Sequence, residues 1–357
     1  MKQSVWMNNR GIALLVTISI IAVLIAGALE WNRRTRTFVV VSAAARNRVT
    51  LTAMAASGVY AAMALLIKDR IDSDTDSLQE DWADPEKIEE ALRQIPFESG
   101  AVRFKITDER SKIQVNALVR NPGGREFNES QWELWDRFLR QLPAPETYHE
   151  DTDPNAIINS LKDWLDSGDN EAVTGLSGAE SGYYQGLQPP YPCRNGPFDH
   201  PDELALVKGM TMELLNGAGE MPGISRYVTV HGVTAAEEQT NTFDGKVNIN
   251  TADLPVLTAL LPSDSGDIAQ AIYDYRLETS DRAYIHDLSK PEWYKDVPGA
   301  GGLQIDPGLI TTQSDIFSID AEASLGEMKI RVTAVVQRQK DKKSGRWGCK
   351  VLNWQTK

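Results

Sequence analysis

Residues 10–29 of the chain read RGIALLVTISIIAVLIAGAL, and this stretch decides how the protein is organised. No charged residue interrupts the apolar run from Ile12 to Leu29. As a helix the run extends about 27 Å, which nearly matches the roughly 30 Å hydrocarbon core of a bilayer. Lys2 and Arg10 precede it, and basic residues on that side favour a cytoplasmic N-terminus and an extracytoplasmic body. The stretch therefore predicts a single membrane span.

Three fates are open to this segment. A secretory signal is cut after its apolar run, and residues 26–28 (AGA) fit such a site. An uncut signal anchor is the second possibility. The third follows from residues 10–12 (RGI), which resemble the leader of prepilins, where cleavage after the glycine keeps the apolar segment and the new N-terminus is methylated. That resemblance implies cleavage after Gly11 and a mature chain that begins at Ile12.

The helical pattern continues far beyond the apolar run. From Trp31 to about Arg70 the sequence is rich in alanine and contains no proline. An apolar stripe at spacings of three and four is formed by Leu51, Met54, Ala55, Gly58, Ala62 and Leu65. We therefore expect one helix over residues 12–70, with 12–29 in lipid, the second half under a globular head and the stripe docked against other subunits. A coiled coil fits less well, because alanine and glycine are poor heptad core residues.

The fifth residue after the expected cleavage site is Val16. Most pilin-like subunits have a glutamate there, which pairs in lipid with the terminal amine of a neighbouring subunit. An ionised carboxylate in hydrocarbon requires such a partner, and a subunit at the tip of a filament has no earlier neighbour to supply it. The resemblance therefore implies that this valine marks a tip subunit.

The composition is that of a folded body with no general affinity for nucleic acid. The 357 residues allow one large domain or two ordinary ones, and 41% hydrophobic residues are enough for real cores. The formal net charge of -13 opposes phosphate binding, which depends largely on lysine and arginine.

Alternating sequences flank a helical middle. Residues 100–108 and 111–119 predict a β-hairpin, and three C-terminal stretches, 314–324, 328–339 and 346–354, predict further strands of one sheet. Amphipathic or proline-initiated helices are expected to begin near Ser130, Asp153, His200 and Thr251. The expected fold class is α+β, a pilin fold with a large inserted α-helical domain. The expected division is 1–11 leader, 12–70 long helix, 71–124 first part of the sheet domain, 125–312 insertion and 313–357 C-terminal strands.

Within the expected insertion, residues 247–261 and 268–276 resemble a helix-hairpin-helix module of the kind that binds DNA. DNA-binding versions place a glycine-rich turn between the helices, exposing backbone N–H groups to phosphate. Here residues 262–267 read PSDSGD, whose carboxylates repel phosphate. A packing role is favoured, and no nucleic-acid partner is expected.

Several short motifs in order strongly resemble the K subunit family of type II secretion systems. They are DWLD (163–166), GAE (178–180), YY (183–184), PPY (189–191), NGPFD (195–199) and ELALVKGM (203–210). The resemblance implies a minor pseudopilin at the pseudopilus tip, required for pseudopilus assembly and protein export across the outer membrane. Its implied partners are the I and J pseudopilins, with H as a further candidate, the pseudopilus shaft, prepilin peptidase and secreted cargo. Its implied location is the bacterial inner membrane, crossed once, with the body in the periplasm.

Carboxylates are concentrated in residues 163–171, and hard oxygen ligands on a loop suit Ca²⁺. The resemblance implies calcium in the inserted domain. The ligands carried over are Asp166, Asp169, Glu171 and Glu180. Gly168 stands where the family often has an acidic residue, which would weaken the site. A solvated acidic loop is the alternative, since the spacing of an EF-hand is not matched.

The two cysteines, Cys193 and Cys349, are too few for a four-cysteine zinc site. In an oxidising compartment one disulfide could join them, and two separate thiols are the other option.

Catalytic motifs are absent from the sequence. The four histidines are His149, His200, His231 and His286. None belongs to an HExxH motif, and the chain contains neither GxSxG nor a P-loop. His149 adjoins Glu150 and Asp151, but a surface charge run explains that cluster more simply than acid/base chemistry. We expect no enzymatic activity, and the alternative functions are a periplasmic DNA-binding protein and an uncharacterised periplasmic hydrolase.

Overall fold

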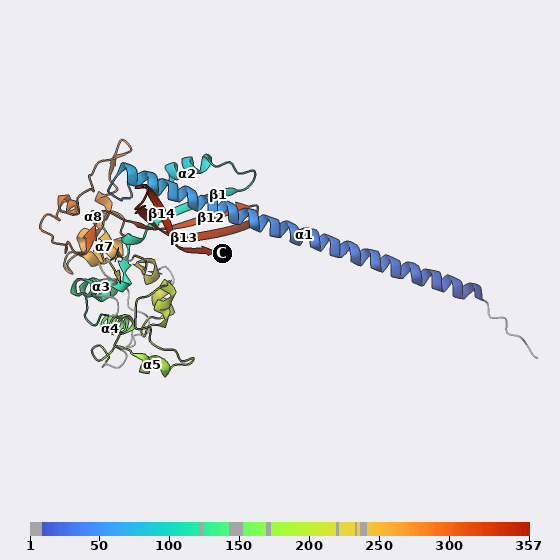
Figure 1. Cartoon of the computed structure of the whole chain (residues 1–357), viewed down its shortest axis with the longest axis horizontal. Helices are drawn as coiled ribbons and strands as arrows, with labels where there is room; N and C mark the ends of the chain where they lie inside the picture. The colour runs from blue at the N-terminus through green and yellow to red at the C-terminus, as the bar shows by residue number, and fades with distance from the viewer. Residues whose placement is uncertain are drawn as a thin grey trace, which may run out of the picture.

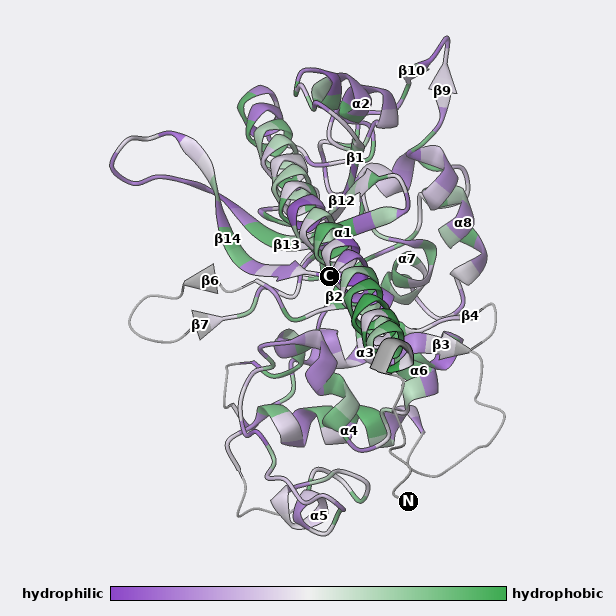
Figure 2. Ribbon diagram, turned by 90° about the vertical axis from the view of Figure 1, so that its right-hand side faces the viewer, coloured by the Kyte–Doolittle hydropathy of each residue, from purple (hydrophilic) through white to green (hydrophobic). Residues whose placement is uncertain are grey.

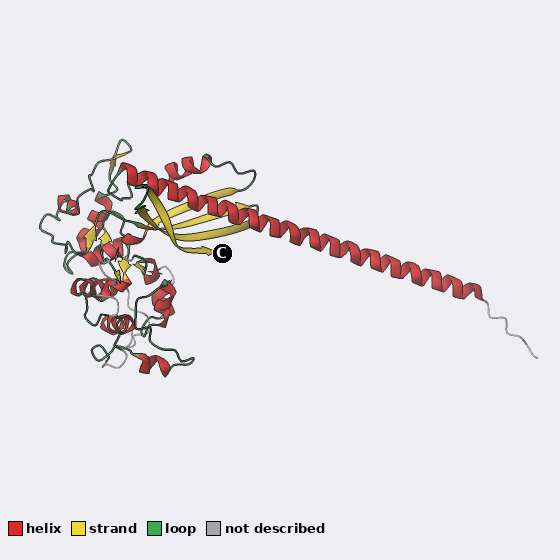
Figure 3. Ribbon diagram, in the orientation of Figure 1, coloured by secondary structure: helices red, strands yellow, loops and turns green. Residues whose placement is uncertain are grey.

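The computed structural model describes residues 9–120, 124–142, 153–168, 173–218, 221–232, 234–235 and 241–357. A single long helix projects from a head made of two parts (Figure 1). One part is a sheet that lies along the inner half of the helix, and the other is a largely helical body to its side (Figure 3). The chain therefore has the shape of a rod that carries a head at one end.

The long helix α1 runs from Asn9 to Asp72. Of the described residues, only this helix is long and apolar enough to cross a membrane, and its most apolar window is entirely exposed. Figure 2, which looks down the helix from its N-terminal end, shows that end in the colour of hydrophobic residues. The expectation of one continuous helix is confirmed.

The apolar stripe of α1 packs on the protein's own sheet. Leu51, Ala55 and Ala62 are completely buried there, together with Leu66, whereas the predicted Leu65 is only half-buried. The expectation that this half of the helix lies under the head is therefore confirmed, whereas the expectation that its stripe docks against other subunits is wrong. The reason is that the sheet presents an apolar face within the same chain, which covers the stripe without any partner.

Gly58 allows this close packing. A Cβ atom at this position would lie 2.8 Å from Val102 Cγ1 and 3.3 Å from Ala321 Cβ. A larger side chain in the middle of the stripe would separate the helix from the sheet, so the close approach depends on glycine.

Four antiparallel strands form the sheet. They are β1 (Ala101–Asp108), β12 (Ile316–Leu325), β13 (Met328–Lys340) and β14 (Trp347–Thr356), in the order β1-β12-β13-β14. Alternate residues of β12 are buried, as a sheet with one covered face requires. The three C-terminal strands and their single sheet are confirmed. A short helix, α2 (Pro85–Arg93), lies beside α1 and β1.

The predicted hairpin between residues 100–108 and 111–119 is wrong. After Asp108 the chain turns away through a 3₁₀ turn, and β2 (Ile113–Gln114) pairs with β5 (Val228–Thr229) instead of with β1. The apolar side chains of 111–119 are buried in the core of the insertion, where nearly every residue of this segment is covered and burial does not alternate. The chain thus leaves the sheet after β1 and returns at β12, so the helical body begins before the expected boundary at residue 125.

The insertion has its own hydrophobic core, separate from the core between α1 and the sheet. Its helices are α3 (Glu129–Gln141), α4 (Pro154–Leu165), α5 (Ser181–Gln185), α6 (Met212–Asn216), α7 (Leu254–Leu260) and α8 (Gly266–Tyr275). Its remaining strands pair as β3 (Gly217–Ala218) with β4 (Met221–Pro222), β6 (Thr234–Ala235) with β7 (Asn241–Thr242), β8 (Val247–Asn248) with β11 (Ile310–Thr311) and β9 (Thr279–Ser280) with β10 (Ala283–Tyr284).

Most predicted helices of the insertion are present. In α4 the Asp153 side chain accepts a hydrogen bond of 2.9 Å from Asn155 N, as the capping pattern indicates. The helix expected from His200 is broken, however, into a 3₁₀-helix over Pro201–Leu206 and α6. Gly209 between them has a φ of +83°, which a continuous helix does not allow, and Thr211 caps the second piece.

Candidate functional site

The residues of the predicted processing site lie on the exposed end of α1. Ile12 and Val16 are 52% and 51% exposed, and nothing lies within 4 Å of a Cβ built on Gly11. The side chains at this end of α1 are therefore open to contact with lipid or with a neighbouring helix. Cleavage and methylation stay predictions.

A second exposed apolar segment follows the membrane span. Glu30 forms ion pairs with Arg33 and Arg34, and after this polar girdle the side chains of residues 38–41 are again apolar and exposed. The side chain of Phe38, for example, is 70% exposed. Because apolar side chains all round a helix are stable only when covered, this part of the rod requires a cover of lipid or of other helices.

A buried carboxylate cluster lies in the insertion. Asp163 and Asp166 come from the end of α4, and Glu180 immediately precedes α5. One oxygen from each lies within 4.8 Å of the others, and all three residues are buried. Of the predicted ligands, the structure brings together Asp166 and Glu180, whereas Asp169 and Glu171 fall outside the described residues. Asp163 was missed, although its spacing of three from Asp166 places both on one side of the helix end.

The geometry of this cluster explains part of the GAE motif. Both carboxylate oxygens of Asp163 accept hydrogen bonds of 3.1 Å from Thr174 N. A Cβ on Gly178 would lie 2.1 Å from Asp163 Oδ2, so only glycine lets the loop close over the carboxylate. Burial raises the pKa of Asp163, and its hydrogen bonds with Thr174 counter that shift.

The chemistry of the cluster suits a hard cation. All three side chains offer carboxylate oxygens, which are the donors that Ca²⁺ prefers. Asp166 is already engaged, however, since its Oδ1 accepts from Gly168 N at 2.9 Å and its Oδ2 accepts from Lys162 Nζ at 2.7 Å. The donor set fits calcium, and the lysine is an additional feature that the sequence did not point to.

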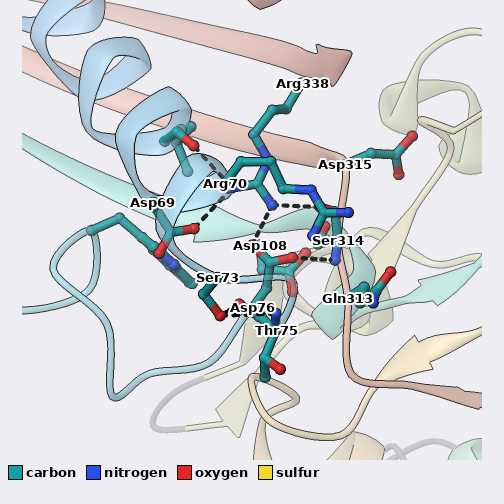
Figure 4. Close-up of polar contacts among 12 residues, drawn as sticks. Asp69, Arg70, Ser73, Thr75, Asp76, Asp108, Gln313, Ser314, Asp315 and Arg338 are labelled. Atoms are coloured by element: carbon teal, nitrogen blue, oxygen red, sulfur yellow. Dashed lines mark hydrogen bonds and ion pairs between the residues drawn. The ribbon is translucent and has the colours of Figure 1, made fainter. Parts of the chain in front are cut away.

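A second cluster joins the end of the rod and the loop after it to the sheet (Figure 4). Arg338 on β13 is 2% exposed and donates to Asp69 Oδ2 at 2.8 Å and to Asp76 Oδ1. Asp76 in turn accepts from Ser314 N at 2.7 Å. The carboxylates of Asp69, Asp76 and Glu80 lie close enough together to hold a metal ion. The guanidinium of Arg338, however, already provides the positive charge that a metal ion would bring to this group. We therefore assign this cluster a structural role and not a metal-binding one.

Two asparagines of residues 247–252 (VNINTA) tie the same loop to the insertion. Asn248 Nδ2 and Asn250 Nδ2 donate to the carbonyl oxygen of Asp76 at 3.0 and 3.2 Å. Asn248 Nδ2 also donates to Asp108 Oδ2 at 2.9 Å. These buried amides fix the loop after α1 to the insertion, a role that the residue pattern did not reveal.

The helix-hairpin-helix-like module is integrated into the core. Helices α7 and α8 pack together, and Arg276 after α8 is buried, donating to the carbonyl oxygens of Ile249 and Ala252 at 2.9 and 2.7 Å. Its guanidinium is thus used inside the protein. These contacts favour the packing role, and the absence of a nucleic-acid partner stays a prediction.

The two cysteines lie in different cores. Cys193 is buried in the insertion, with its Sγ 3.5 Å from the carbonyl oxygen of Asp163, whereas Cys349 on β14 lies beside α1. No disulfide joins this pair, both of whose members are described. Of the two options left by the sequence, the structure has the two thiols.

The described histidines serve separate local roles. His200 caps the 3₁₀-helix that follows it, and His286 pairs with Glu278 at 2.8 Å. His231 is partly buried near Lys112 and Glu109, and burial lowers its pKa. His149, with its two acidic neighbours, lies outside the described residues.

These features define a class of protein. An apolar helix that continues into a head, packs there on a four-stranded antiparallel sheet and carries a helical insertion has the fold of the pilin class, with a helix long and apolar enough to cross a membrane. The comparisons with known proteins specify which member of the pilin class the chain resembles.

Residues 111–221 match the family model described as type II secretion system (T2SS), protein K. Type II secretion system protein K of Pseudomonas aeruginosa is 27% identical over 271 residues, which cover 75% of this chain and 68% of that protein. The protein K of Aeromonas hydrophila is 25% identical over 217 residues, or 57% of this chain and 60% of that protein. The resemblance to protein K drawn from the motifs is confirmed.

The fold agrees with that assignment. In the crystal structure of the GspK–GspI–GspJ complex from the type 2 secretion system of enterotoxigenic Escherichia coli, one chain matches with a TM-score of 0.62. The match covers 88% of this chain and 99% of that one, at 16% identity. The pilin fold with an inserted helical domain is thus confirmed.

Proposed function

We propose that the protein is a minor pseudopilin at the tip of a type II secretion pseudopilus, needed for pseudopilus assembly and for protein export across the outer membrane. The observation that carries this proposal is the continuity of α1. One helix holds an exposed membrane-length apolar segment, a second exposed apolar segment and a buried stripe under the head. A helix of this kind inserts in a membrane and then in a bundle of similar helices.

The place at the tip is supported by two features. Val16 supplies no carboxylate for the terminal amine of an adjoining subunit. The insertion adds a large body to one side of the rod (Figure 1), which would obstruct the regular stacking of identical heads along a shaft. Both features suit an end position, with cargo contact through the insertion.

The partners follow from the relative of known structure, which forms a complex with GspI and GspJ. The corresponding I and J pseudopilins are the expected neighbours of this chain, with H and the shaft subunits below them. Prepilin peptidase would cleave after Gly11 and the new N-terminus, Ile12, would be methylated. The helix would cross the inner membrane once, with its N-terminus in the cytoplasm and the head in the periplasm.

The work of such a subunit is organisational and involves no catalysis. Among the described residues, the ion pairs Arg338–Asp76 and Lys162–Asp166 and the capping His200 are occupied by structural contacts. A calcium ion would bind at Asp163, Asp166 and Glu180, where it would offset the charge of buried carboxylates and stabilise the insertion.

Mass spectrometry of the protein from cells that contain the secretion machinery tests the anchor. A methylated Ile12 at the N-terminus is the expected result. A chain that begins at Leu29, or an uncut leader, contradicts the proposal.

Photo-crosslinking tests the neighbours. A crosslinker at Val40, which is 66% exposed on the rod, should yield adducts with the I or J pseudopilin. The matched control is Lys343 in the exposed turn between β13 and β14, where no such adduct is expected. If the Val40 position of the membrane-inserted protein forms no adduct with any pseudopilin, the filament role is refuted.

A further inference from the structure

Lys162 occupies an unusual position for a lysine. It lies in the last turn of α4 and is only 8% exposed. Its Nζ donates to Asp166 Oδ2 at 2.7 Å and to Thr174 Oγ1 at 3.0 Å, and lies 5.7 Å from the ring centroid of Phe127. A buried ammonium is costly unless charges and hydrogen bonds compensate it, so this lysine is held in place by its carboxylate partner.

The local backbone maintains this arrangement. Lys162 and Asp166 are four residues apart, and Asp166 N donates to the carbonyl oxygen of Lys162 at 2.9 Å, which continues the helix to its last residue. Thr174, the second partner of the ammonium, also donates its backbone N–H to Asp163. The ammonium is therefore built into the same network that orders the carboxylates.

We propose that Lys162 is the built-in counter-cation of the carboxylate cluster, which keeps the cluster folded without a metal and weakens its affinity for Ca²⁺. This inference deepens the calcium part of the proposed function and depends on it. A calcium ion held by the three carboxylates takes Asp166 as a ligand, so it must either share that carboxylate with the ammonium or displace the ammonium. Sharing brings like charges together in a buried site, and displacement leaves an ammonium without its carboxylate.

The proposal predicts how the two cations compete. With the lysine present, the cluster is stable in chelator and binds calcium weakly. Without the lysine, the three carboxylates repel one another until a metal ion replaces the missing charge. Removing the ammonium should therefore lower stability in chelator and raise calcium affinity at the same time, an opposition that simple damage to the fold would not produce.

The test uses the full chain purified in detergent, with Ca²⁺ titrated by calorimetry after treatment with chelator. Lys162→Met keeps the aliphatic stem and removes the charge, and we expect it to bind Ca²⁺ about tenfold or more tightly than the wild type. Its melting temperature should be lower than that of the wild type in chelator and should rise further on addition of Ca²⁺. Lys68→Met is the control, because it removes an exposed lysine on α1 and causes the same change in net charge.

Lys162→Gln is the second variant, in case the methionine variant does not fold in chelator. It keeps a hydrogen-bond donor near Asp166 and removes only the charge, so it too should bind Ca²⁺ more tightly. Equal dissociation constants for the wild type and Lys162→Gln overturn the role of the lysine, and leave the calcium site in place if both bind. If neither protein binds Ca²⁺, the calcium proposal fails as well, whereas the pseudopilin role is tested separately by the crosslinks at Val40.

Discussion

Glu80 gives the clearest test of the junction that Asp69, Asp76 and Arg338 form at the end of the rod. Its Oε2 accepts from Ser77 N at 3.0 Å and from Trp82 Nε1 at 2.9 Å. Burial raises its pKa to about 8, and the neighbouring charge of Asp69 adds to the shift. Burial likewise raises the pKa of Asp76 to about 7, although Arg338 opposes that change. At neutral pH the junction therefore retains protons that the unfolded chain would release.

The direction of the resulting pH dependence follows from linkage. A carboxyl group with a raised folded-state pKa stabilises the fold fully below its unfolded value of 4.5, and this contribution is lost as the pH rises towards about 8. Each such group changes the free energy of unfolding by at most about 1.4 kcal/mol per pH unit. Solvent screening and coupling reduce this limit, so we expect Glu80 to account for about 1–2 kcal/mol between pH 5.5 and pH 7.5.

Glu80→Gln mimics the protonated carboxyl group and does not titrate. Its amide oxygen can still accept from Ser77 and Trp82, and its amide N–H₂ can donate to Asp69. The variant should match the wild type near pH 5 and be about 1–2 kcal/mol more stable near pH 7.5. For a chain of this size that difference corresponds to about 2–4 °C in melting temperature.

The measurement is thermal unfolding of the full chain in detergent across this pH range, with Glu90→Gln on the exposed face of α2 as the control. Taking the difference between variant and wild type removes the titration of all other groups. A variant that is less stable than the wild type at every pH, or that has the same pH slope, would refute the assignment of a protonated Glu80.

Three further changes test the packing and the clusters by the same unfolding measurement. Gly58→Leu should lower stability by about 2–3 kcal/mol, because its side chain collides with β1 and with the centre of β12, and equal stability would contradict the close packing of α1. Arg338→Met should cost about 3–5 kcal/mol at pH 7.5 and less at pH 5.5, where Asp76 takes up a proton; a loss independent of pH would count against this reading. Gly178→Ala should cost about 1–3 kcal/mol and abolish any calcium-dependent stabilisation, because its Cβ displaces Asp163, and an unchanged calcium response would disprove that geometry.

Much of the fold could be read from local sequence patterns. The membrane segment and α1 could be predicted from an uninterrupted apolar run and from the proline-free sequence after it. A helix satisfies its backbone hydrogen bonds within its own segment, so these features need no partner. The C-terminal strands follow from alternation, and α4 from its aspartate cap and initial proline. Each of these signals is local, so each was visible without knowledge of a partner.

What only the tertiary structure decided is which surfaces meet. The stripe on α1 was correctly placed on the helix but assigned to the wrong partner, and residues 111–119 alternate like a strand of the sheet although they enter the core of the insertion. Apolar patterns state that a side chain must be buried and not where, because the hydrophobic effect has no direction.

The carboxylate cluster shows the same division. An acidic run pointed to the end of α4, but Asp163, Asp166 and Glu180 meet only because the loop over Gly178 folds back on the helix. Lys162 could not be distinguished in the sequence from a solvated lysine. The sequence determined a membrane-anchored rod with a head. Folding decided which charges meet inside that head, because ion pairs depend on distances between segments that are far apart along the chain.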